Sequence, residues 1–425
     1  MGLGAVENAI AAIARGELVV VVDDQDRENE GDLILAASRA SREAVAFMLR
    51  HTSGILCASL SPQRLADLNL PLMVADNTES HRTAFTITVD YRHGTTTGIS
   101  AADRSATLRA LADSAVGAAD FARPGHIFPL RHQEGGVLRR RGHTEAASDL
   151  ARLAGLGPYG VLSEIVNRDG SVANRAELEA FAREHDLAMI SVADLVLYRR
   201  RHEKLVEPIG EARLPTQHGT FSLRAYRSLY DGNEHIALVK GPITDAPTLV
   251  RVHSECVTGD LFGSARCDCG AQLDAAMAKI AETGSGILVY LRGHEGRGIG
   301  LAHKLQAYRL QDQGRDTVEA NLELGLPIDA RSYDIGAQIL TDLGVTSIRL
   351  MSNNPLKFTE LDGYDLKVVE RVPLVTTPTI ENWRYLVTKQ RRLGHMLDGS
   401  APAAGEALIQ QTVLPAMHTL SRCSG

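Results

Sequence analysis

The feature that most constrains the fold of this chain is an uninterrupted valine-rich run, "LVVVV", at residues 18–22. A run of this kind is typical of a strand that is buried on both faces of a sheet. Directly before it, Val6, Ala9 and Ile13 recur at the spacing of one helix face, and Gly16 follows as a stop signal. The sequence therefore predicts that helices pack against a buried sheet.

Helical and extended patterns alternate along the rest of the chain. We expect helices at residues 41–51, 144–155, 271–284 and 301–314, and strands at residues 54–60, 221–228, 235–241 and 286–291. The fold class that this alternation predicts is α+β or α/β, with two layered mixed α–β domains.

The domain boundaries are predicted from composition. The segment "RRRHEKLVEPIGEARLPTQHG" is polar and basic and holds two prolines, which indicates a junction near residues 204–215. We therefore expect one domain at residues 1–204 and a second at residues 205–400. Residues 401–425 are low in complexity, and we expect a flexible tail there.

Composition argues against several classes of protein. The 425 residues carry a formal charge of −7, whereas a nucleic-acid-binding or membrane-surface protein usually has a basic footprint. No apolar run reaches the length of a membrane span, and the first residues lack the pattern of a secretory signal. We therefore expect a cytoplasmic protein without nucleic-acid or membrane partners.

An acidic segment, "DDQDRENEGD" at residues 23–32, follows the predicted strand directly. Loops at the carboxyl ends of buried strands are where α/β proteins usually bind ligands, and carboxylates there suit Mg²⁺. A calcium-binding EF-hand loop is excluded, because a loop that starts at Asp26 has Ala37 where a glutamate is required. A solvated acidic loop is the alternative to a metal site.

A basic segment, "RRRGHT" at residues 139–144, precedes a predicted helix. We expect Thr144 to cap this helix, so that the helix N-terminus can bind an anion. A basic turn on the surface is the alternative.

Five motifs in the first half of the chain resemble the 3,4-dihydroxy-2-butanone 4-phosphate synthases of riboflavin biosynthesis. They are "DDQDRENEGD", "HRTAFTITVD", "TTTGISAADR", "RPGHIFPLR" and "GGVLRRRGHTEAA", in the order of the family, over most of residues 5–200. The resemblance implies conversion of ribulose 5-phosphate to dihydroxybutanone phosphate and formate, with Mg²⁺ or Mn²⁺ bound by Glu28 and His143. It also implies catalytic roles for Glu28, His143 and Glu164. The residues implied to bind ribulose 5-phosphate are Arg27, Glu28, Asp32, Arg140, Arg141, Gly142, His143, Thr144 and Glu164.

Three of the five cysteines, Cys256, Cys267 and Cys269, are spaced C-x10-C-x-C. As thiolates they would give three soft ligands to Zn²⁺. A catalytic zinc site has three protein ligands and a water, whereas a structural site is closed by a fourth ligand, for which His253 is the candidate. Burial as small hydrophobic residues is a further alternative. The sequence thus indicates a metal site and leaves its fourth position open.

Charged residues follow the cysteines in two further segments. The Gly-rich segment "GHEGRGIG" at residues 293–300 comes after a predicted strand and carries Arg297, which suits a phosphate. It matches neither the P-loop pattern nor the dinucleotide-binding pattern. Asp329 and Arg331 lie two residues apart and would share one face of an extended backbone.

Five motifs in the second half, from about residue 208 to residue 398, resemble GTP cyclohydrolase II. They are "RVHSEC", "TGDLFGSARCDCG", "RGHEGRGIGL", "DARSYDIGAQIL" and "NNPLKF". The resemblance implies a catalytic zinc on Cys256, Cys267 and Cys269. It also implies hydrolysis of GTP to 2,5-diamino-6-ribosylamino-4(3H)-pyrimidinone 5′-phosphate, formate and pyrophosphate. The residues implied to bind GTP are Arg251, Val252, His253, Ser254, Glu255, Gln272, Glu295, Gly296, Arg297, Tyr308, Thr317, Ser352 and Lys357.

The same resemblance assigns catalytic roles to two further residues. Asp329 is implied to be the proton acceptor and Arg331 the nucleophile at the α-phosphorus. Because a guanidinium stays protonated in proteins, stabilisation of transition-state charge is the physically easier role for Arg331.

The whole chain thus resembles the bifunctional riboflavin biosynthesis proteins, and the family suggests a homodimer. Two alternatives are an enzyme in which only the cyclohydrolase half is active, and a zinc-stabilised nucleotide-binding module without catalysis.

Overall fold

The computed structural model describes all residues except 1–2, 25–26, 80, 362–363, 365 and 398–425, so the predicted tail lies outside the described residues. The chain separates into two units, Met1–Glu203 and Lys204–Gly425. Among the described helices, none has the length and apolar content that crossing a membrane requires. Each unit has its own sheet and its own hydrophobic core.

The first unit contains a mixed seven-stranded sheet in the order β4-β5-β3-β6-β2-β1-β7. Its strand β1 pairs antiparallel with β2 and parallel with β7. Its main elements are α1 (Leu3–Arg15), β1 (Val19–Val22), β2 (Gly31–Ala36), α2 (Arg42–His51), β3 (Cys57–Leu60), α3 (Pro62–Asp67), β4 (Val89–Tyr91), α4 (Ala101–Ala112), β5 (Phe121–Arg131), α5 (His143–Leu153), β6 (Gly160–Glu164), α6 (Arg175–Glu184), β7 (Ala188–Ser191) and α7 (Val192–His202).

Alternation along β1 and β2 divides the core of this unit into two layers. Val20 and Leu33 face a cluster that includes buried residues of α2, α4 and α6. Val19 and Ile34 face the opposite cluster, which includes buried residues of α1, α5 and α7. Every residue of β1 and β2 is buried, as the valine-rich run predicted. Helices therefore cover both faces of the sheet, and the ligand-bearing loops must lie at its ends.

The second unit has a seven-stranded sheet in the order β14-β13-β11-β12-β10-β9-β8. The strands from β14 to β12 pair in parallel, and those from β12 to β8 pair antiparallel. Its main elements are β8 (Val206–Thr216), β9 (Gly219–Ser228), β10 (Glu234–Lys240), β11 (Thr248–Ser254), α8 (Val257–Asp260), α9 (Cys269–Thr283), β12 (Gly286–Leu291), the 3-10 turn η4 (Glu295–Arg297), α10 (Gly300–Asp312), α11 (Thr317–Glu323), α12 (Asp334–Asp342), β13 (Ser347–Met351), α13 (Leu356–Leu361), β14 (Lys367–Val372) and α14 (Trp383–Leu393).

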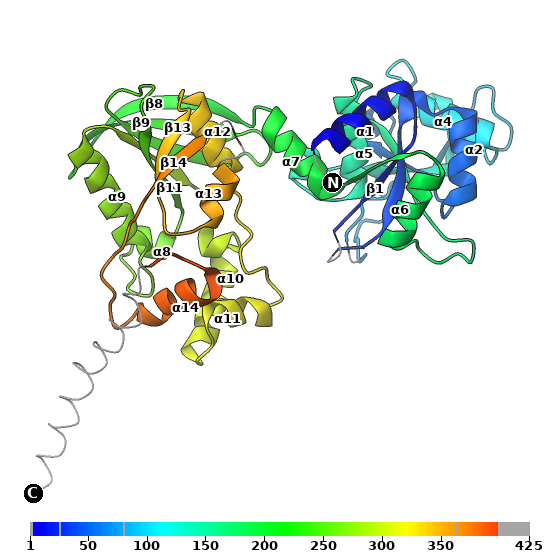
Figure 1. The fold of residues 1–425 in the computed structure, drawn as a ribbon. Helices are drawn as coiled ribbons and strands as arrows, with labels where there is room; N and C mark the ends of the chain where they lie inside the picture. The colour runs from blue at the N-terminus through cyan, green and yellow to red at the C-terminus, as the bar shows by residue number, and fades with distance from the viewer. Residues whose placement is uncertain (1–2, 25–26, 80, 362–363, 365, 398–425) are drawn as a thin grey trace, which may run out of the picture. The chain divides into compact units, whose positions relative to one another are not determined.

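Helices α9 and α12 pack against this second sheet from opposite sides (Figure 1). Ala276 and Ile280 of α9 join the cluster that contains Leu249 and Leu288. Helices α8, α10, α11 and α14 gather beyond one end of the sheet, where β11 and β12 lead into α8 and η4 (Figure 1). The carboxyl ends of these parallel strands and the helices beyond them therefore enclose a site.

The fold class predicted from the sequence, two layered mixed α–β domains, is confirmed. The segment predicted as a polar junction, residues 204–215, begins where the two units divide, and most of it is strand β8 and not a linker. Pro208 and Pro215 are tolerated there because β8 is the edge of the sheet and its register shifts beside Pro208.

Two candidate active sites

The acidic loop between β1 and β2 is organised by its first carboxylate. Asp23 is buried, and its Oδ2 accepts hydrogen bonds from Arg27 Nη1 at 2.8 Å and from the backbone N–H of Glu28 at 3.1 Å. Its Oδ1 accepts from the backbone N–H of Glu30 at 3.0 Å. The sequence placed Asp23 in the acidic segment suited to Mg²⁺ but gave it no role of its own, although its place directly after a buried strand was a usable signal. Asp23 thus fixes the loop that presents Glu28.

The loop brings a carboxylate to the first residue of α5. Glu28 Oε2 lies 3.6 Å from His143 Nδ1, and the possible ligand atoms of Asp23, Glu28 and His143 all lie within 4.8 Å of one another. Asp32 Oδ1 lies 3.9 Å from the same His143 nitrogen. Asp32 Oδ1 and His143 Nε2 are buried and have no hydrogen-bond partner among the described residues. These orphaned polar atoms and the mixed carboxylate–imidazole set fit a divalent cation.

The charge states at this site are mutually dependent. Burial by itself raises the pKa of Glu28, but the hydrogen bond to His143 and the charge of Arg27 outweigh burial and lower the pKa to about 2. Burial likewise opposes the charged form of His143, yet Asp32 and Glu28 raise its pKa to about 9. Burial, aided by Glu164, raises the pKa of Asp32 to about 7. One ionised carboxylate and one carboxyl that can hold a proton near neutral pH therefore face the same histidine.

Two guanidinium groups approach the N-terminus of α5. A Cβ atom built on Gly142 would lie 2.4 Å from Arg140 Nη1 and 3.1 Å from Arg27 Nη2, so a larger residue there would displace the Arg140 guanidinium. The residue before the helix is Gly142, and Thr144 lies within the first turn, so the prediction that Thr144 caps the helix is wrong. The backbone N–H groups of the first turn and the two arginines suit an anion.

The remaining residues implied for this site lie around it. Arg141 is exposed and directly precedes Gly142. Glu164 ends β6 opposite Asp32 in the strand register and is exposed. His81 Nε2 lies 3.9 Å from Glu28 Oε1. His81 begins the motif "HRTAFTITVD" but was not predicted as a site residue.

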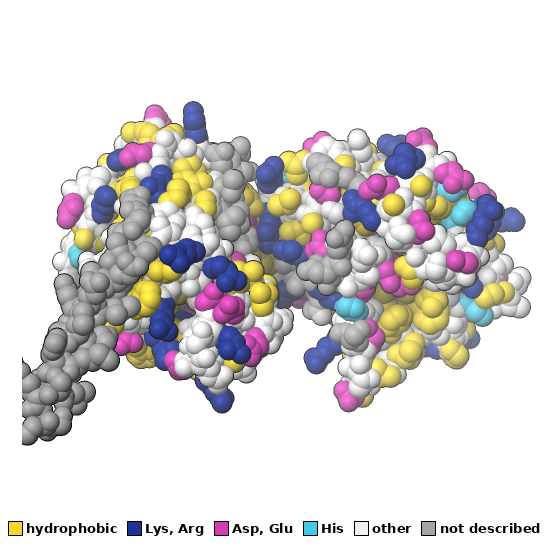
Figure 2. All heavy atoms as spheres, turned by 60° about the horizontal axis from the view of Figure 1, so that its bottom comes forward, with side chains coloured by type: hydrophobic (Ala, Val, Ile, Leu, Met, Phe, Trp, Pro, Cys, Tyr) yellow, Lys and Arg dark blue, Asp and Glu magenta, His cyan; other side chains and the backbone are white. Residues whose placement is uncertain are grey.

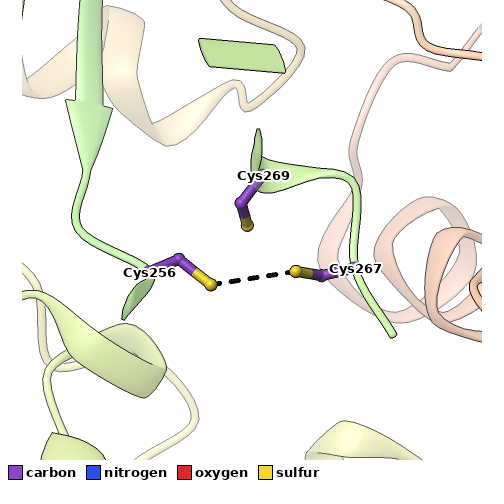
Figure 3. Close-up of side chains that lie close together, drawn as sticks. All are labelled: Cys256, Cys267 and Cys269. Atoms are coloured by element: carbon purple, nitrogen blue, oxygen red, sulfur yellow. Dashed lines mark hydrogen bonds between the residues drawn. The ribbon is translucent and has the colours of Figure 1, made fainter. Parts of the chain in front are cut away.

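The three cysteines of the second unit converge. Cys256 follows β11, Cys269 begins α9, and the three sulfur atoms point toward one another (Figure 3). The Sγ atoms of Cys256 and Cys267 are 3.7 Å apart, and all three Sγ atoms lie within 4.8 Å of one another. Gly259 of α8 sits against them, since a Cβ atom there would lie 2.9 Å from Cys267 Sγ. The donor set and its spacing fit one soft metal ion.

His253 is directed to a carboxylate. Its Nε2 lies 3.1 Å from Asp260 Oδ1, and Asp260 also accepts from the backbone N–H of Cys256 at 2.9 Å and from the hydroxyl of Tyr290 at 2.8 Å. The metal-ligand group found among the described residues contains the three cysteines without His253. This geometry favours a three-cysteine site over one closed by His253.

A buried lysine contacts the cysteine group. Lys304 Nζ lies 3.2 Å from Cys256 Sγ and 2.8 Å from Thr258 Oγ1, and it also donates to Glu295 Oε1. The hydrogen bonds from the other two cysteines, followed by the charge of Lys304, lower the pKa of Cys256. Lys304 was not predicted from the sequence, because it lies three residues beyond the end of the motif "RGHEGRGIGL".

A cavity opens beside the cysteines. Of the residues implied to bind GTP, eleven line it: Arg251, His253, Ser254, Glu255, Gln272, Gly296, Arg297, Tyr308, Thr317, Ser352 and Lys357. Arg331 and the three cysteines also line it. Three other predicted residues are not part of the lining. Val252 is fully buried, on the opposite face of β11 from Arg251 and His253. The Glu295 carboxylate is held by Lys304 and the backbone N–H of Val257, and Asp329 pairs with Arg331.

The cavity contains positive charge that is incompletely neutralised. Arg297 Nη1 and Nη2 are buried without hydrogen-bond partners among the residues that the structure describes. Burial, together with Arg251, Arg331 and Lys389, holds the pKa of Lys357 well below its usual range. Basic and acidic side chains are interspersed on the face shown in Figure 2, whereas these cations are concentrated inside the cavity. Such a cavity suits a ligand with several negative charges.

Asp329 and Arg331 form a bidentate ion pair beside this cavity. Arg331 Nε donates to Asp329 Oδ1 at 2.8 Å, and Arg331 Nη2 donates to Asp329 Oδ2. Burial opposes the charge of Arg331, but Tyr333 and Asp329 raise its pKa. The guanidinium therefore stays protonated, which suits charge stabilisation better than nucleophilic attack.

Several residues of the cavity were not predicted. They are Arg266, His294, Ile299, Lys304, Ala307, Gln311, Asn321, Asn353, Asn354, Tyr385, Lys389 and His395. His294, Asn353 and Asn354 lie within quoted motifs and could have been added from them. Tyr385, Lys389 and His395 lie outside every motif, so the sequence offered no signal for them.

Comparisons with known proteins agree with this division. The family model for 3,4-dihydroxy-2-butanone 4-phosphate synthase matches residues 7–198, and the model for GTP cyclohydrolase II matches residues 207–373. The chain is 59% identical over 397 residues to the riboflavin biosynthesis protein RibBA of Nocardia farcinica, covering 93% of this chain and 96% of that protein. It is also 59% identical over 398 residues to the bifunctional riboflavin biosynthesis protein RIBA 1, chloroplastic, of Arabidopsis thaliana, covering 93% and 73%.

A solved structure supports the fold of both units. The chain is similar to RibBX, a two-domain 3,4-dihydroxy-2-butanone 4-phosphate synthase from A. baumannii, with a TM-score of 0.67 and 39% sequence identity. The similarity covers 87% of this chain and 99% of that chain. The resemblances that the sequence motifs carried are therefore confirmed. This chain belongs to the family of bifunctional riboflavin biosynthesis proteins, which join a 3,4-dihydroxy-2-butanone 4-phosphate synthase to a GTP cyclohydrolase II.

Proposed function

We propose that the two units perform separate reactions on ribulose 5-phosphate and on GTP. The first unit forms 3,4-dihydroxy-2-butanone 4-phosphate and formate. The second unit forms 2,5-diamino-6-ribosylamino-4(3H)-pyrimidinone 5′-phosphate, formate and pyrophosphate. The observation that carries the proposal is the convergence of three cysteines beside a cavity whose buried cations call for a polyanionic ligand.

In the first unit, Glu28 and His143 would bind Mg²⁺ or Mn²⁺, with Asp23 within reach. A metal bound there would act as a Lewis acid on the carbonyl of the sugar phosphate. Arg27 and Arg140 converge at the N-terminus of α5 and would hold the phosphate. Arg27 Nη1 also lies 2.9 Å from Glu28 Oε2, so the proposed phosphate site adjoins the proposed metal ligands.

Proton transfer in the first unit needs a group that can exist in both protonation states. Asp32 is fully buried next to His143, and burial raises its pKa to about 7. Glu164 lies opposite Asp32 in the strand register and remains exposed. We assign proton transfer during enolisation to this pair of carboxyl groups.

In the second unit, Cys256, Cys267 and Cys269 would bind Zn²⁺ and leave its fourth position to water. Zinc bound there would lower the pKa of that water for attack on C8 of GTP. The hydrogen bonds of Asp260 to His253 and to the backbone of Cys256 hold the strand end and the first ligand together. Lys304 offsets part of the negative charge of three thiolates.

The cations of the cavity would hold the triphosphate. Arg251 Nε and both terminal nitrogens of Arg297 are buried without partners among the described residues. Lys357, whose Nζ donates to the Val252 carbonyl at 2.9 Å, lines the same cavity. Arg331 would stabilise the charge that develops at the α-phosphorus, and Asp329 would orient it and accept a proton. A homodimer, as the family resemblance suggests, is part of the proposal and is checked by sedimentation equilibrium.

The test measures formate release from each substrate separately. Cys267→Ser should abolish formate release from GTP and lower the zinc content, while formate release from ribulose 5-phosphate continues. Glu28→Ala should do the reverse, so each variant is the folding control of the other. Cys57→Ala is the matched cysteine control, because Cys57 is a buried residue of β3 in the first unit. Wild-type protein that releases no formate from GTP in the presence of zinc would refute the assignment of the cysteine site.

A further inference from the structure

Helix α14 lies beyond the part of the chain that the GTP cyclohydrolase II model matches, which ends at residue 373. It nevertheless supplies the cavity with Tyr385 and Lys389, and His395 follows directly after it. The residues that line the cavity from α14 come from the far end of the described chain, whereas the cysteines lie more than a hundred residues earlier. The cavity is therefore incomplete without this helix.

A chain of buried polar contacts joins α14 to the cysteine segment. Lys389 Nζ lies 2.6 Å from Oδ1 of Asp268, the residue between Cys267 and Cys269. Gln272 Nε2 donates to Asp268 Oδ2 at 2.6 Å, and Arg251 Nη2 donates to Gln272 Oε1 at 2.7 Å. The Lys389 and Asp268 side chains are only 9% and 2% exposed, so water screens this ion pair little. The position of α14 is thus coupled to the metal ligands and to a phosphate-binding arginine.

Further contacts hold α14 and the residues after it against other walls of the cavity. Arg392 Nη1 lies 3.0 Å from Asp316 Oδ2, next to the start of α11. The backbone N–H of Met396 donates to the carbonyl of Asn353 at 2.9 Å. Contacts with two different walls of the cavity therefore hold residues 389–396 in place.

The two side chains that this segment presents are neutral. Burial, together with Lys389 and Arg297, lowers the pKa of His395 to about 3, so its imidazole is uncharged at neutral pH. Burial raises the pKa of Tyr385 to about 12, and Lys389 Nζ lies 4.6 Å from the centre of the Tyr385 ring. A neutral imidazole and a phenol offer hydrogen bonds and an aromatic face, which suit a base or a ribose better than a phosphate.

We propose that α14 and the residues after it, as far as His395, form a wall of the nucleotide site. In this wall Tyr385 and His395 contact the guanine–ribose part of GTP, and Lys389 is a positioning residue that acts through Asp268 and the Tyr385 ring. The inference rests on the proposed hydrolysis of GTP by the second unit. It adds specificity for the nucleoside to the phosphate binding already assigned to Arg251, Arg297 and Lys357.

The first test compares two substitutions on the same helix. Lys389→Met should raise the KM for GTP by about tenfold or more, because the wall and the cysteine segment lose their common anchor. Lys389→Arg, which keeps the charge, should recover part of this loss. Arg391→Gln changes an exposed residue two positions away and should leave the KM unchanged. Formate release from ribulose 5-phosphate should remain at the wild-type level in all three variants, and the KM values are compared at saturating zinc.

The second test separates binding of the nucleoside from binding of phosphate. Tyr385→Ala and His395→Ala should raise the KM for GTP, while the inhibition constant of inorganic pyrophosphate stays at its wild-type value. Asp268→Asn and Lys389→Met should be non-additive when combined, because they remove the same contact. These variants keep the inference testable if Lys389→Met fails to fold.

The outcomes distinguish failure of the proposed function from failure of the role assigned to α14. Wild-type protein that does not release formate from GTP overturns the proposed function and this inference with it. Wild-type activity together with an unchanged KM in Lys389→Met, Tyr385→Ala and His395→Ala overturns only the role of α14. An equal loss of GTP and pyrophosphate binding in Tyr385→Ala and His395→Ala also overturns it, because the wall would then act on phosphate.

Discussion

The cysteine site can be tested without removing any of its ligands, by filling the space at Gly259. A Cβ atom on this residue of α8 would lie 2.9 Å from Cys267 Sγ, 3.1 Å from Cys269 Cβ and 3.2 Å from Cys256 Sγ. Contacts this close to three positions at once cannot be relieved by moving one side chain. Gly259→Ala should therefore push the sulfur atoms apart while leaving all three thiols in the chain.

The size of the effect follows from the energy of overpacking. An added methyl group in a packed site destabilises it by about 1–3 kcal/mol. If this strain falls on the metal-bound form, zinc affinity should drop about 5- to 150-fold, since about 1.4 kcal/mol corresponds to a factor of ten. Formate release from GTP should fall in parallel at limiting zinc and recover in part when zinc is added.

The assay is competition for zinc against a chromophoric chelator, with formate release from both substrates measured on the same samples. Gly210→Ala is the matched control, because a Cβ atom on that glycine of β8 meets nothing within 4 Å. Formate release from ribulose 5-phosphate reports whether the first unit remains folded. If Gly259→Ala binds zinc as tightly as wild type, the three cysteines do not hold the metal packed against Gly259.

Further predictions concern the first unit and the two metals. Gly142→Ala should raise the KM for ribulose 5-phosphate and spare GTP hydrolysis, because the new Cβ would lie 2.4 Å from Arg140 Nη1; an unchanged KM contradicts the phosphate site. Arg199→Met leaves the buried carboxylate of Asp149 without the partner that lies 2.7 Å away, and should destabilise the first unit by about 3–5 kcal/mol in urea unfolding. Burial lowers the pKa of His132 to about 4, so the unfolded chain binds a proton that the folded chain does not. The free energy of unfolding should therefore fall by up to about 3 kcal/mol as the pH drops from about 6.5 to about 4, and His132→Gln should flatten this slope. After chelation, Zn²⁺ alone should restore formate release from GTP, and Mg²⁺ or Mn²⁺ alone should restore release from ribulose 5-phosphate; restoration of both by one metal contradicts the assignment.

Local patterns predicted those elements whose limits depend on nearby residues. The strand expected at residues 286–291 is β12, with the same limits. The helix expected at residues 271–284 is α9, which ends where Gly284 adopts a φ of 80°. Such limits are set by side-chain periodicity and by the freedom of glycine at positive φ, and both are properties of the local sequence.

The segment at residues 204–215 was expected from its polarity and prolines to be a junction, but these features do not distinguish a linker from a sheet edge. In β8 the prolines lie on an edge strand, where fewer backbone N–H groups are needed for the ladder. Whether a strand lies at an edge depends on pairing with β9, which a local pattern does not show. The same limit applies to Thr144, since the start of α5 is set by Gly142 and the groups packed around it.

The sequence by itself determined the chemistry available to this protein. Three cysteines at a C-x10-C-x-C spacing, an acidic loop after a buried strand, and two ordered sets of motifs identified the families and the candidate ligands. Only the tertiary structure decided how that chemistry is arranged. It directed His253 to Asp260, and it brought Lys389 to Asp268 across 121 residues of chain. A motif consists of residues that are close in sequence. A site also contains side chains from distant helices, and only the packing of those helices brings them together.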